Sequence, residues 1–318
     1  MIVITGGAGF IGSNLHAALV RRGELPVVVD TLGHGGQWRN LARHPPARLV
    51  HPAALDDFLA ERPRIDAIIH LGAVVDTTVV DGDLAWATNV ELPTRLHAWC
   101  TTHGARFIYA SSAATYGDGA AGFDDAAPLS TLRPLNLYGW TKHAFDLRMA
   151  ATTAQPRQCV GLKFFNVYGV NEQHKGAMIS VVHTKYAEVR AGRAARLFRS
   201  DRADVADGMQ ARDFIHVDDV VDVLLWLLDH PEVQGLYNLG TGQARTYVDL
   251  AHAVCDAAGR ARAVEFMDMP AALHGQYQSF TQARMDRLRA QGYDRPFTSL
   301  EDGIARTVAR LSGPEPYA

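Results

Sequence analysis

Short apolar runs alternate with longer amphipathic stretches through the first half of the chain. One helical pattern begins near Ile11 and stops at Gly23, after two arginines, as helices commonly end. A longer helical pattern covers residues 84–99. The apolar runs are nearly continuous, which is typical of strands buried on both faces of a parallel sheet. They span residues 2–5, 27–30, 67–71 and 107–111. This alternation predicts a doubly wound, Rossmann-type α/β sheet.

The second half is less regular, with helical and short strand patterns mixed. Helical patterns cover residues 178–190, 217–229, 247–258 and 300–311, and short strands near residues 161–165 and 236–239 extend the sheet. No linker rich in Pro, Gly or Ser separates two independent units, so we expect two parts packed over one cleft. We expect residues 1–165 with 213–245 to form a dinucleotide-binding domain. Residues 166–212 with 246–318 then form a smaller C-terminal substrate-binding cap.

Composition narrows the function classes. The formal net charge of −3 argues against a general nucleic-acid surface. No apolar run approaches the ~20 residues that a membrane helix needs. The N-terminus begins with an apolar strand and no basic leader, which predicts a cytoplasmic protein. The cysteines form no CxxC pair and the histidines show no metal-ligand spacing, so no metal site is expected.

A glycine-rich turn joins the first strand to the first helix. Its glycines are Gly6, Gly9 and Gly12, with Phe10 and Ile11 between the last two. Such glycines allow a tight turn and let a dinucleotide pyrophosphate sit on the amides that open the helix. The spacing is GxxGxxG rather than the GxGxxG of many dehydrogenases, but its position after a strand still predicts a nicotinamide dinucleotide site.

Asp30 ends the second strand, where a carboxylate usually binds the ribose hydroxyls, and Thr31 follows it. A carboxylate there favours NAD. Arg39, just downstream, is either a holder of the 2′-phosphate of NADP or an ordinary surface arginine. These residues alone leave the two cofactors open.

Tyr138 and Lys142 stand four residues apart, on one face if the segment is helical. A free tyrosine has a pKa of about 10, too high for a base at neutral pH. We expect the Lys142 ammonium to lower the Tyr138 pKa, assisted by the positive nicotinamide ring. Ser112 follows the strand over residues 107–111, so its hydroxyl would orient the reacting alcohol. The three residues, in this order after a dinucleotide turn, predict a hydride-transfer site.

Further motifs, in order along most of the chain, resemble the extended short-chain dehydrogenase/reductase family. They are HLGA at 70–73, SSAATYG at 111–117, YGWTK at 138–142, FFNVYG at 164–169 and RDFIHVDDVVD at 212–222. The resemblance implies an enzyme with a nucleotide-sugar substrate whose diphosphate and sugar are held by the cap. It also implies cofactor contacts from Leu71, Gly72, Ala73, Asn89 and Val167, with Asn89 helping to set the active-site helix.

Within that family, the sequence is most similar to the branch that inverts carbon 6 of ADP-glycero-manno-heptose. This similarity rests on HKGAM at 174–178 and GQYQSFTQA at 275–283. It implies oxidation of carbon 6 to a ketone and return of the same hydride to the opposite face, with a tightly bound cofactor, for which it favours NADP. Lys175 is then the second acid/base besides Tyr138, whereas chemistry alone would make it a solvated surface lysine.

The same branch implies substrate contacts and a biological setting. The substrate contacts are Ser112, Asn166, Lys175, Phe198, Arg212 and Tyr277, with Arg212 binding the diphosphate as a bidentate donor. Without the resemblance, Asn166 would be a turn residue, Arg212 a surface charge and Tyr277 an interface aromatic. The branch also implies a homo-oligomer, with a pentamer as the candidate assembly, in the supply of heptose for the lipopolysaccharide core.

Some positions depart from the branch, and rival functions remain open. Leu71 stands where some members have glutamate, Gln37 lies near a position where some have a phosphate-binding lysine, and Ala177 replaces a serine. A UDP-sugar 4-epimerase would share the Ser/Tyr/Lys site but would not need Lys175. A 4,6-dehydratase would carry an Asp-Glu pair after the serine, where this chain has Ala113 and Ala114. A dinucleotide-sensing binding protein without turnover would usually lack the tyrosine or lysine.

Overall fold

The computed structural model describes residues 1–270 and 277–318. The motif at 275–283 therefore lies partly outside the described residues, because Gly275 and Gln276 fall in the gap. Among the described residues, no helix has the length and apolar character needed to cross a membrane.

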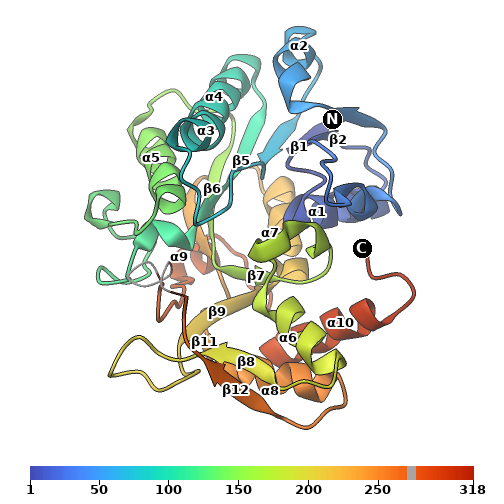
Figure 1. Cartoon of the computed structure of the whole chain (residues 1–318). Coiled ribbons are helices and arrows are strands. Elements are labelled where there is room, and N and C mark those ends of the chain that lie inside the picture. The colour runs from blue at the N-terminus through green and yellow to red at the C-terminus, as the bar shows by residue number, and fades with distance from the viewer. Residues whose placement is uncertain (271–276) are drawn as a thin grey trace.

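A seven-stranded parallel sheet forms the centre of the molecule (Figure 1). Its order is β10-β6-β5-β4-β1-β2-β3, so the chain starts in the middle, runs to one edge and then crosses to the other. The strand order therefore reverses at β1. Doubly wound sheets bind ligands beside such a reversal, at the carboxyl ends of the strands. The strands are β1 (Ile2–Thr5), β2 (Val27–Val29), β3 (Arg48–Val50), β4 (Ala67–His70), β5 (Arg106–Ser112), β6 (Cys159–Phe164) and β10 (Gly235–Leu239).

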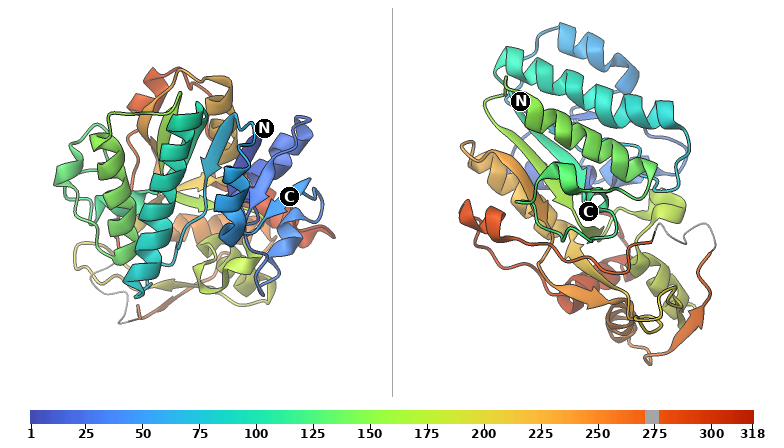
Figure 2. Two further views of the ribbon diagram at one scale, coloured as in Figure 1. Left: turned by 90° about the horizontal axis from the view of Figure 1, so that it is seen from above. Right: turned by 90° about the vertical axis from the view of Figure 1, so that its left-hand side faces the viewer.

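Helices cover both faces of this sheet (Figures 1 and 2). An apolar core lies on each face. On one face Leu15 of α1 and Val220 of α7 pack against the strands, and on the other Leu96 of α4 and Phe145 of α5 do so. The helices of this layer are α1 (Phe10–Arg21), α2 (Leu55–Ala60), α3 (Gly82–Trp86), α4 (Leu92–His103), α5 (Leu137–Ala151), α7 (Val217–Asp229) and α9 (Asp286–Ala290).

The segments that leave the main sheet form a smaller layer beside the strands' carboxyl ends. One sheet has the order β11-β9-β7 and another pairs β12 with β8. A third apolar core, which includes Leu250 and Ile304, holds these sheets to their helices. The elements are β7 (Asn166–Tyr168), α6 (Val181–Arg190), β8 (Ala195–Phe198), β9 (Ala211–His216), β11 (Ala244–Thr246), α8 (Tyr247–Ala257), β12 (Val264–Met267) and α10 (Leu300–Ser312).

The predicted Rossmann-type sheet is confirmed, and two local details differ from the prediction. The helical pattern over 84–99 is confirmed, but a π-helical turn at Ala87–Glu91 interrupts it between α3 and α4. Pro93 lies in the first turn of α4, where its missing amide is tolerated, but it could not have continued a regular helix from α3. The helix expected from residue 178 begins instead at Val181, after a 3₁₀ turn over Gln173–Met178.

Candidate active site

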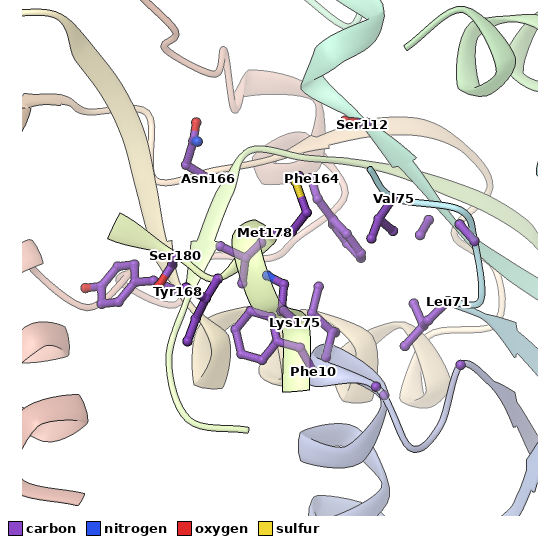
Figure 3. Close-up of a pocket in the computed structure, with 18 of the residues that line it drawn as sticks. Phe10, Leu71, Val75, Ser112, Phe164, Asn166, Tyr168, Lys175, Met178 and Ser180 are labelled. Carbon is purple, nitrogen blue, oxygen red and sulfur yellow. The ribbon is translucent and has the colours of Figure 1, made fainter. Parts of the chain in front are cut away.

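A cavity of about 620 Å³ lies at the carboxyl ends of the central strands, between the main sheet and the smaller layer (Figure 3). It brings together most of the predicted site. Its lining includes Gly6, Gly9, Phe10, Ile11, Gly12, Asp30, Leu71, Gly72, Ala73, Ser112, Tyr138, Lys142, Asn166, Val167 and Lys175. Six predicted residues are not part of its lining: Thr31, Arg39, Asn89, Phe198, Arg212 and Tyr277.

The glycine turn forms one wall of the cavity and needs glycine for steric reasons. A Cβ on Gly12 would lie 2.1 Å from the backbone oxygen of Gly6, and one on Gly6 would lie 2.6 Å from the amide nitrogen of Gly72. Gly9 caps α1 without any side-chain hydrogen bond, so no side chain competes for the amides of the first helical turn. Because those amides open onto the cavity, the turn fits the pyrophosphate of a nicotinamide dinucleotide.

Asp30 is fixed beside this turn by three donors. Its Oδ2 accepts from the Ala8 amide at 2.9 Å and from Gln37 Nε2 at 3.2 Å, and its Oδ1 accepts from the Thr31 amide at 2.7 Å. Burial raises the pKa of Asp30, and the hydrogen bonds act against that rise. Arg39 is exposed and lies over the Trp38 ring, 5.5 Å from its centroid. The group beside Asp30 in the cavity is therefore the neutral amide of Gln37.

The predicted hydride-transfer residues come together at the ends of β5 and α5. Asn136 caps α5 by accepting from the Gly139 amide at 2.8 Å, which confirms that the Tyr138–Lys142 segment is helical. Lys142 Nζ is buried and donates to the Ala110 carbonyl at 2.9 Å. Burial lowers the pKa of Lys142 to about 8.

The expected effect of Lys142 on Tyr138 is wrong for the protein alone. Burial raises the pKa of Tyr138, a hydrogen bond with Ser112 acts in the opposite direction, and the charge of Asp146 raises it further. The reason is that Lys142 directs its hydrogen bond to the Ala110 carbonyl, so desolvation of the phenol dominates. A lower pKa for Tyr138 would therefore have to come from the positive charge of a bound nicotinamide ring.

Lys175 enters the cavity from the 3₁₀ turn between β7 and α6 and lies beside Phe10, with Nζ 4.9 Å from the ring centroid (Figure 3). Its Nζ donates to Glu172 Oε2 at 2.9 Å. The Glu172 side chain has no exposed surface, whereas 21% of the Lys175 side chain is exposed. Glu172 also accepts from the Gly169 amide at 3.1 Å and the Ser180 amide at 3.0 Å. Lys175 is therefore a paired lysine at a cavity wall, not a solvated surface lysine.

Arg212, Tyr277 and Phe198 lie together in the smaller layer. The Arg212 guanidinium is 4.8 Å from the Tyr277 ring centroid and 5.7 Å from that of Tyr247, and the rings of Phe198 and Tyr277 are 6.5 Å apart. Arg212 is only 4% exposed, yet among residues 1–270 and 277–318 it forms no ion pair with a carboxylate. Tyr247 belongs to the cavity lining and so connects this cluster to the cavity. The sequence motifs did not indicate Tyr247.

Asn89 lies behind the cavity, in the π-helical turn. Its Oδ1 accepts from the Val74 amide at 2.9 Å, and its Nδ2 donates to the Val74 carbonyl and to Thr141 Oγ1, both at 3.0 Å. It thus ties the loop after β4 to α5. In the part of the chain that the structure describes, no group of three or more His, Cys, Asp and Glu residues could hold a metal ion.

The chain has few lysines, and the sequence motifs did not show that these lysines occupy special positions. They are Lys142, Lys163, Lys175 and Lys185, among 31 basic residues that are otherwise arginine. Lys163, Lys175 and Lys185 each pair with a carboxylate, and Lys142 lines the cavity beside Tyr138. A lysine in this chain therefore marks an interior or cavity position.

Comparison with known proteins agrees with the geometry. The model of the NAD dependent epimerase/dehydratase family matches residues 2–240. The ADP-L-glycero-D-manno-heptose-6-epimerase of Nitratidesulfovibrio vulgaris is 46% identical over 323 residues, covering 100% of both chains. The structure of the Helicobacter pylori protein of that name superimposes with a TM-score of 0.82 at 28% identity, over 98% of this chain and 96% of that one. A Thermus thermophilus UDP-glucose 4-epimerase in complex with NAD gives 0.76 at 26% identity, over 98% and 99%.

Proposed function

The chain belongs to the NAD dependent epimerase/dehydratase family, and on that basis we propose that it inverts carbon 6 of ADP-glycero-manno-heptose. The observation that carries this proposal is Lys175, paired with Glu172 at the wall of a cavity that also holds Ser112 and Tyr138. The two proton-transfer groups come from different elements, α5 and the turn after β7. This arrangement suits a reaction in which each group exchanges a proton with one of the two epimers. The similarity to ADP-heptose 6-epimerases over the full chain supports the substrate.

In the proposed reaction, Tyr138 accepts the proton of the 6-hydroxyl of one epimer while the Ser112 hydroxyl orients that oxygen. A nicotinamide cofactor held by the glycine turn and Asp30 would supply the chemistry of accepting a hydride from carbon 6 and returning it. Lys175 donates the proton to the oxygen of the 6-ketone when the hydride comes back to the opposite face. In the reverse direction the two residues exchange roles, so carbon 6 is inverted without net oxidation.

We propose NAD as the cofactor, in preference to the NADP that the resemblance favours. The Asp30 carboxylate and the neutral Gln37 amide occupy the position beside the glycine turn, and neither can neutralise a 2′-phosphate. Arg39 stacks on Trp38 outside the cavity lining. The test is mass spectrometry of the dinucleotide released from denatured protein, followed by binding of NAD and NADP to the emptied protein. Tighter binding of NADP would contradict this proposal.

For the nucleotide diphosphate, we propose Arg212 as the cationic contact, with Tyr277 and Phe198 beside it. Among the described residues, the buried Arg212 guanidinium contacts the Ala211 carbonyl and two tyrosine rings but no carboxylate, so it can still bind an anion, and a diphosphate offers a bidentate geometry. Asn166 belongs to the same cavity lining as Ser112 and would contact the sugar (Figure 3). Replacing Arg212 with Met should raise KM for the nucleotide sugar much more than it lowers kcat.

The proposed substrate brings with it the wider setting expected from the sequence. The protein would be a cytoplasmic homo-oligomer that supplies heptose for the lipopolysaccharide core. Light scattering on the purified protein tests the assembly, with a pentamer as the expected state.

The decisive experiment is proton NMR of ADP-D-glycero-D-manno-heptose incubated with the purified protein in buffered D₂O, without added cofactor. The L-glycero epimer should form with no deuterium at carbon 6, because the hydride is retained between the two half-reactions. Turnover of UDP-sugars but not of ADP-heptose would contradict the substrate. Activity that requires added cofactor would contradict tight retention.

A further inference from the structure

A fully buried ion pair lies behind the catalytic residues. Lys163 Nζ on β6 is 2.6 Å from Asp146 Oδ2 on α5, and the two side chains are 1% and 0% exposed. Burying a charge pair is expensive, and apolar residues of similar size often serve stability equally well. Its presence therefore calls for an explanation beyond stability.

The contacts of the pair converge on the strand end that carries Ser112. Ser111 Oγ donates to Asp146 Oδ2 at 2.7 Å, which fixes the residue before Ser112. Lys163 Nζ also donates to Thr115 Oγ1 at 2.6 Å, and Thr115 Oγ1 in turn donates to the Ser112 carbonyl at 2.8 Å. Ser112 is thus held through both its neighbour and its own backbone.

The same pair acts on the catalytic helix. Tyr138, Lys142 and Asp146 are spaced four residues apart in α5, which places them along one face. The carboxylate of Asp146 raises the pKa of Lys142 against the larger lowering by burial, and it also raises the pKa of Tyr138. Its negative charge therefore favours the ammonium of Lys142 and disfavours the phenolate of Tyr138.

Four other titratable side chains surround this face of α5, two histidines and two tyrosines. From β4, burial lowers the pKa of His70 to about 3, so this residue stays neutral near pH 8. His143, on α5, senses both charges of the pair, and burial lowers its pKa as well. Tyr109 from β5 and Tyr116 feel the Asp146 charge, and burial raises the pKa of each, so both remain neutral. Asp146 is therefore the charge that acts on Lys142 from behind.

We propose that Asp146 and Lys163 are positioning residues of the catalytic site, which hold Ser112 in place against Tyr138 and Lys142, and that Asp146 also favours the charged form of Lys142. The role in turnover rests on the proposed function, but the effect on Lys142 does not. The pair acts through Ser111, Thr115 and the helix face, without touching the cavity, and neither residue belongs to the cavity lining.

The test replaces the whole pair, because removing one partner would leave a buried unpaired charge. The double variant Asp146→Asn/Lys163→Met removes both charges at similar volume. The matched control is Glu188→Gln/Lys185→Met, which removes another Lys–carboxylate pair, 2.8 Å apart and 9% exposed on each side. Neither control residue lines the cavity. Thermal unfolding and bound dinucleotide are measured for each protein.

One readout does not depend on turnover. Because the chain has four lysines, NMR of protein with ¹³Cε-labelled lysine gives few signals, and loss of one signal in Lys142→Met assigns it. In the wild type, Lys142 should titrate near pH 8. In Asp146→Asn/Lys163→Met the titration should move to lower pH, because the carboxylate that favours the ammonium is gone. An unchanged titration would overturn the electrostatic part of the proposal, whether or not the wild type epimerises ADP-heptose.

The second readout is epimerisation. In the double variant kcat should fall about 10- to 100-fold with little change in KM, the effect of a displaced reacting group, and the control should match the wild type. A double variant with wild-type kcat would overturn the positioning role. An inactive wild type would refute the proposed function, and the titration of Lys142 would then test the role of the ion pair by itself. If the double variant does not fold, Thr115→Val decides, since it breaks only the link to Ser112: a lower kcat supports the proposal and an unchanged kcat refutes it.

Discussion

Replacing Lys175 with Met should damage both stability and turnover, and the structure allows the two effects to be separated. Removing one partner of a buried ion pair typically costs ~3–5 kcal/mol. Lys175 is 21% exposed, and Glu172 keeps its two amide donors, so we expect a smaller loss of about 2 kcal/mol. At roughly 2–4 °C per kcal/mol, the unfolding temperature should fall by about 5 °C. Loss of a proton-transfer group should lower kcat by ~10² to 10⁴.

The variant Glu172→Gln/Lys175→Met separates these contributions. It removes the buried unpaired charge, so the unfolding temperature should recover most of the loss, while kcat should stay as low as in Lys175→Met. Differential scanning calorimetry and the NMR assay of epimerisation measure the two quantities on the same preparations, with the bound dinucleotide quantified in each. A Lys175→Met protein as stable as the wild type would refute the energetic role of the pair. Full epimerisation by it would refute the second acid/base.

Three further predictions concern Tyr138, the glycine turn and Lys142. Tyr138→Phe should lower kcat by ~10² to 10⁴ with cofactor binding and unfolding temperature retained, as measured by kinetics and calorimetry. Gly12→Ala should abolish co-purification of the dinucleotide and lower the unfolding temperature, because its Cβ would lie 2.1 Å from a backbone oxygen; Gly82→Ala, with nothing within 4 Å, is its control. Since burial lowers the pKa of Lys142 to about 8, its ammonium is present below that pH and lost above it, so a pH profile of kcat/KM should decline above about pH 8.

The elements that the sequence predicted well are those whose pattern is local. Strands such as β1 are continuous apolar runs, and the runs were read correctly to within two residues. The strand β3 over Arg48–Val50 gave no such signal, because it lies at the sheet edge and only Val50 is buried. The π-helical turn before α4 was also missed, since apolar periodicity does not register one extra residue per turn.

The site residues also divide into those with a local sequence pattern and those that only the fold brings together. Gly6, Tyr138 and Lys142 stand in motifs with characteristic spacing, so their order along the chain was sufficient to predict that they line one cavity. Asp146 and Lys163 are 17 residues apart, on a helix and a strand, and only the fold reveals that they pair. The pKa of Tyr138 was misjudged for a related reason: the spacing shows a nearby ammonium, but it does not show how deeply the phenol is buried or where that ammonium donates.

The scarcity of lysine makes the protein unusual toward amine-reactive reagents. Of the four lysines, Lys163 and Lys185 are buried in ion pairs and Lys142 is 4% exposed, so Lys175 offers the most accessible side-chain amine. Reagents that acylate amines, which are routinely used to attach dyes or to fix enzymes to beads, would thus find their most accessible lysine at the cavity wall. The protein would lose activity under labelling conditions that most enzymes tolerate, and a bound nucleotide sugar would protect it. An electrophilic sugar-nucleotide analogue would then find a ready-made attachment point.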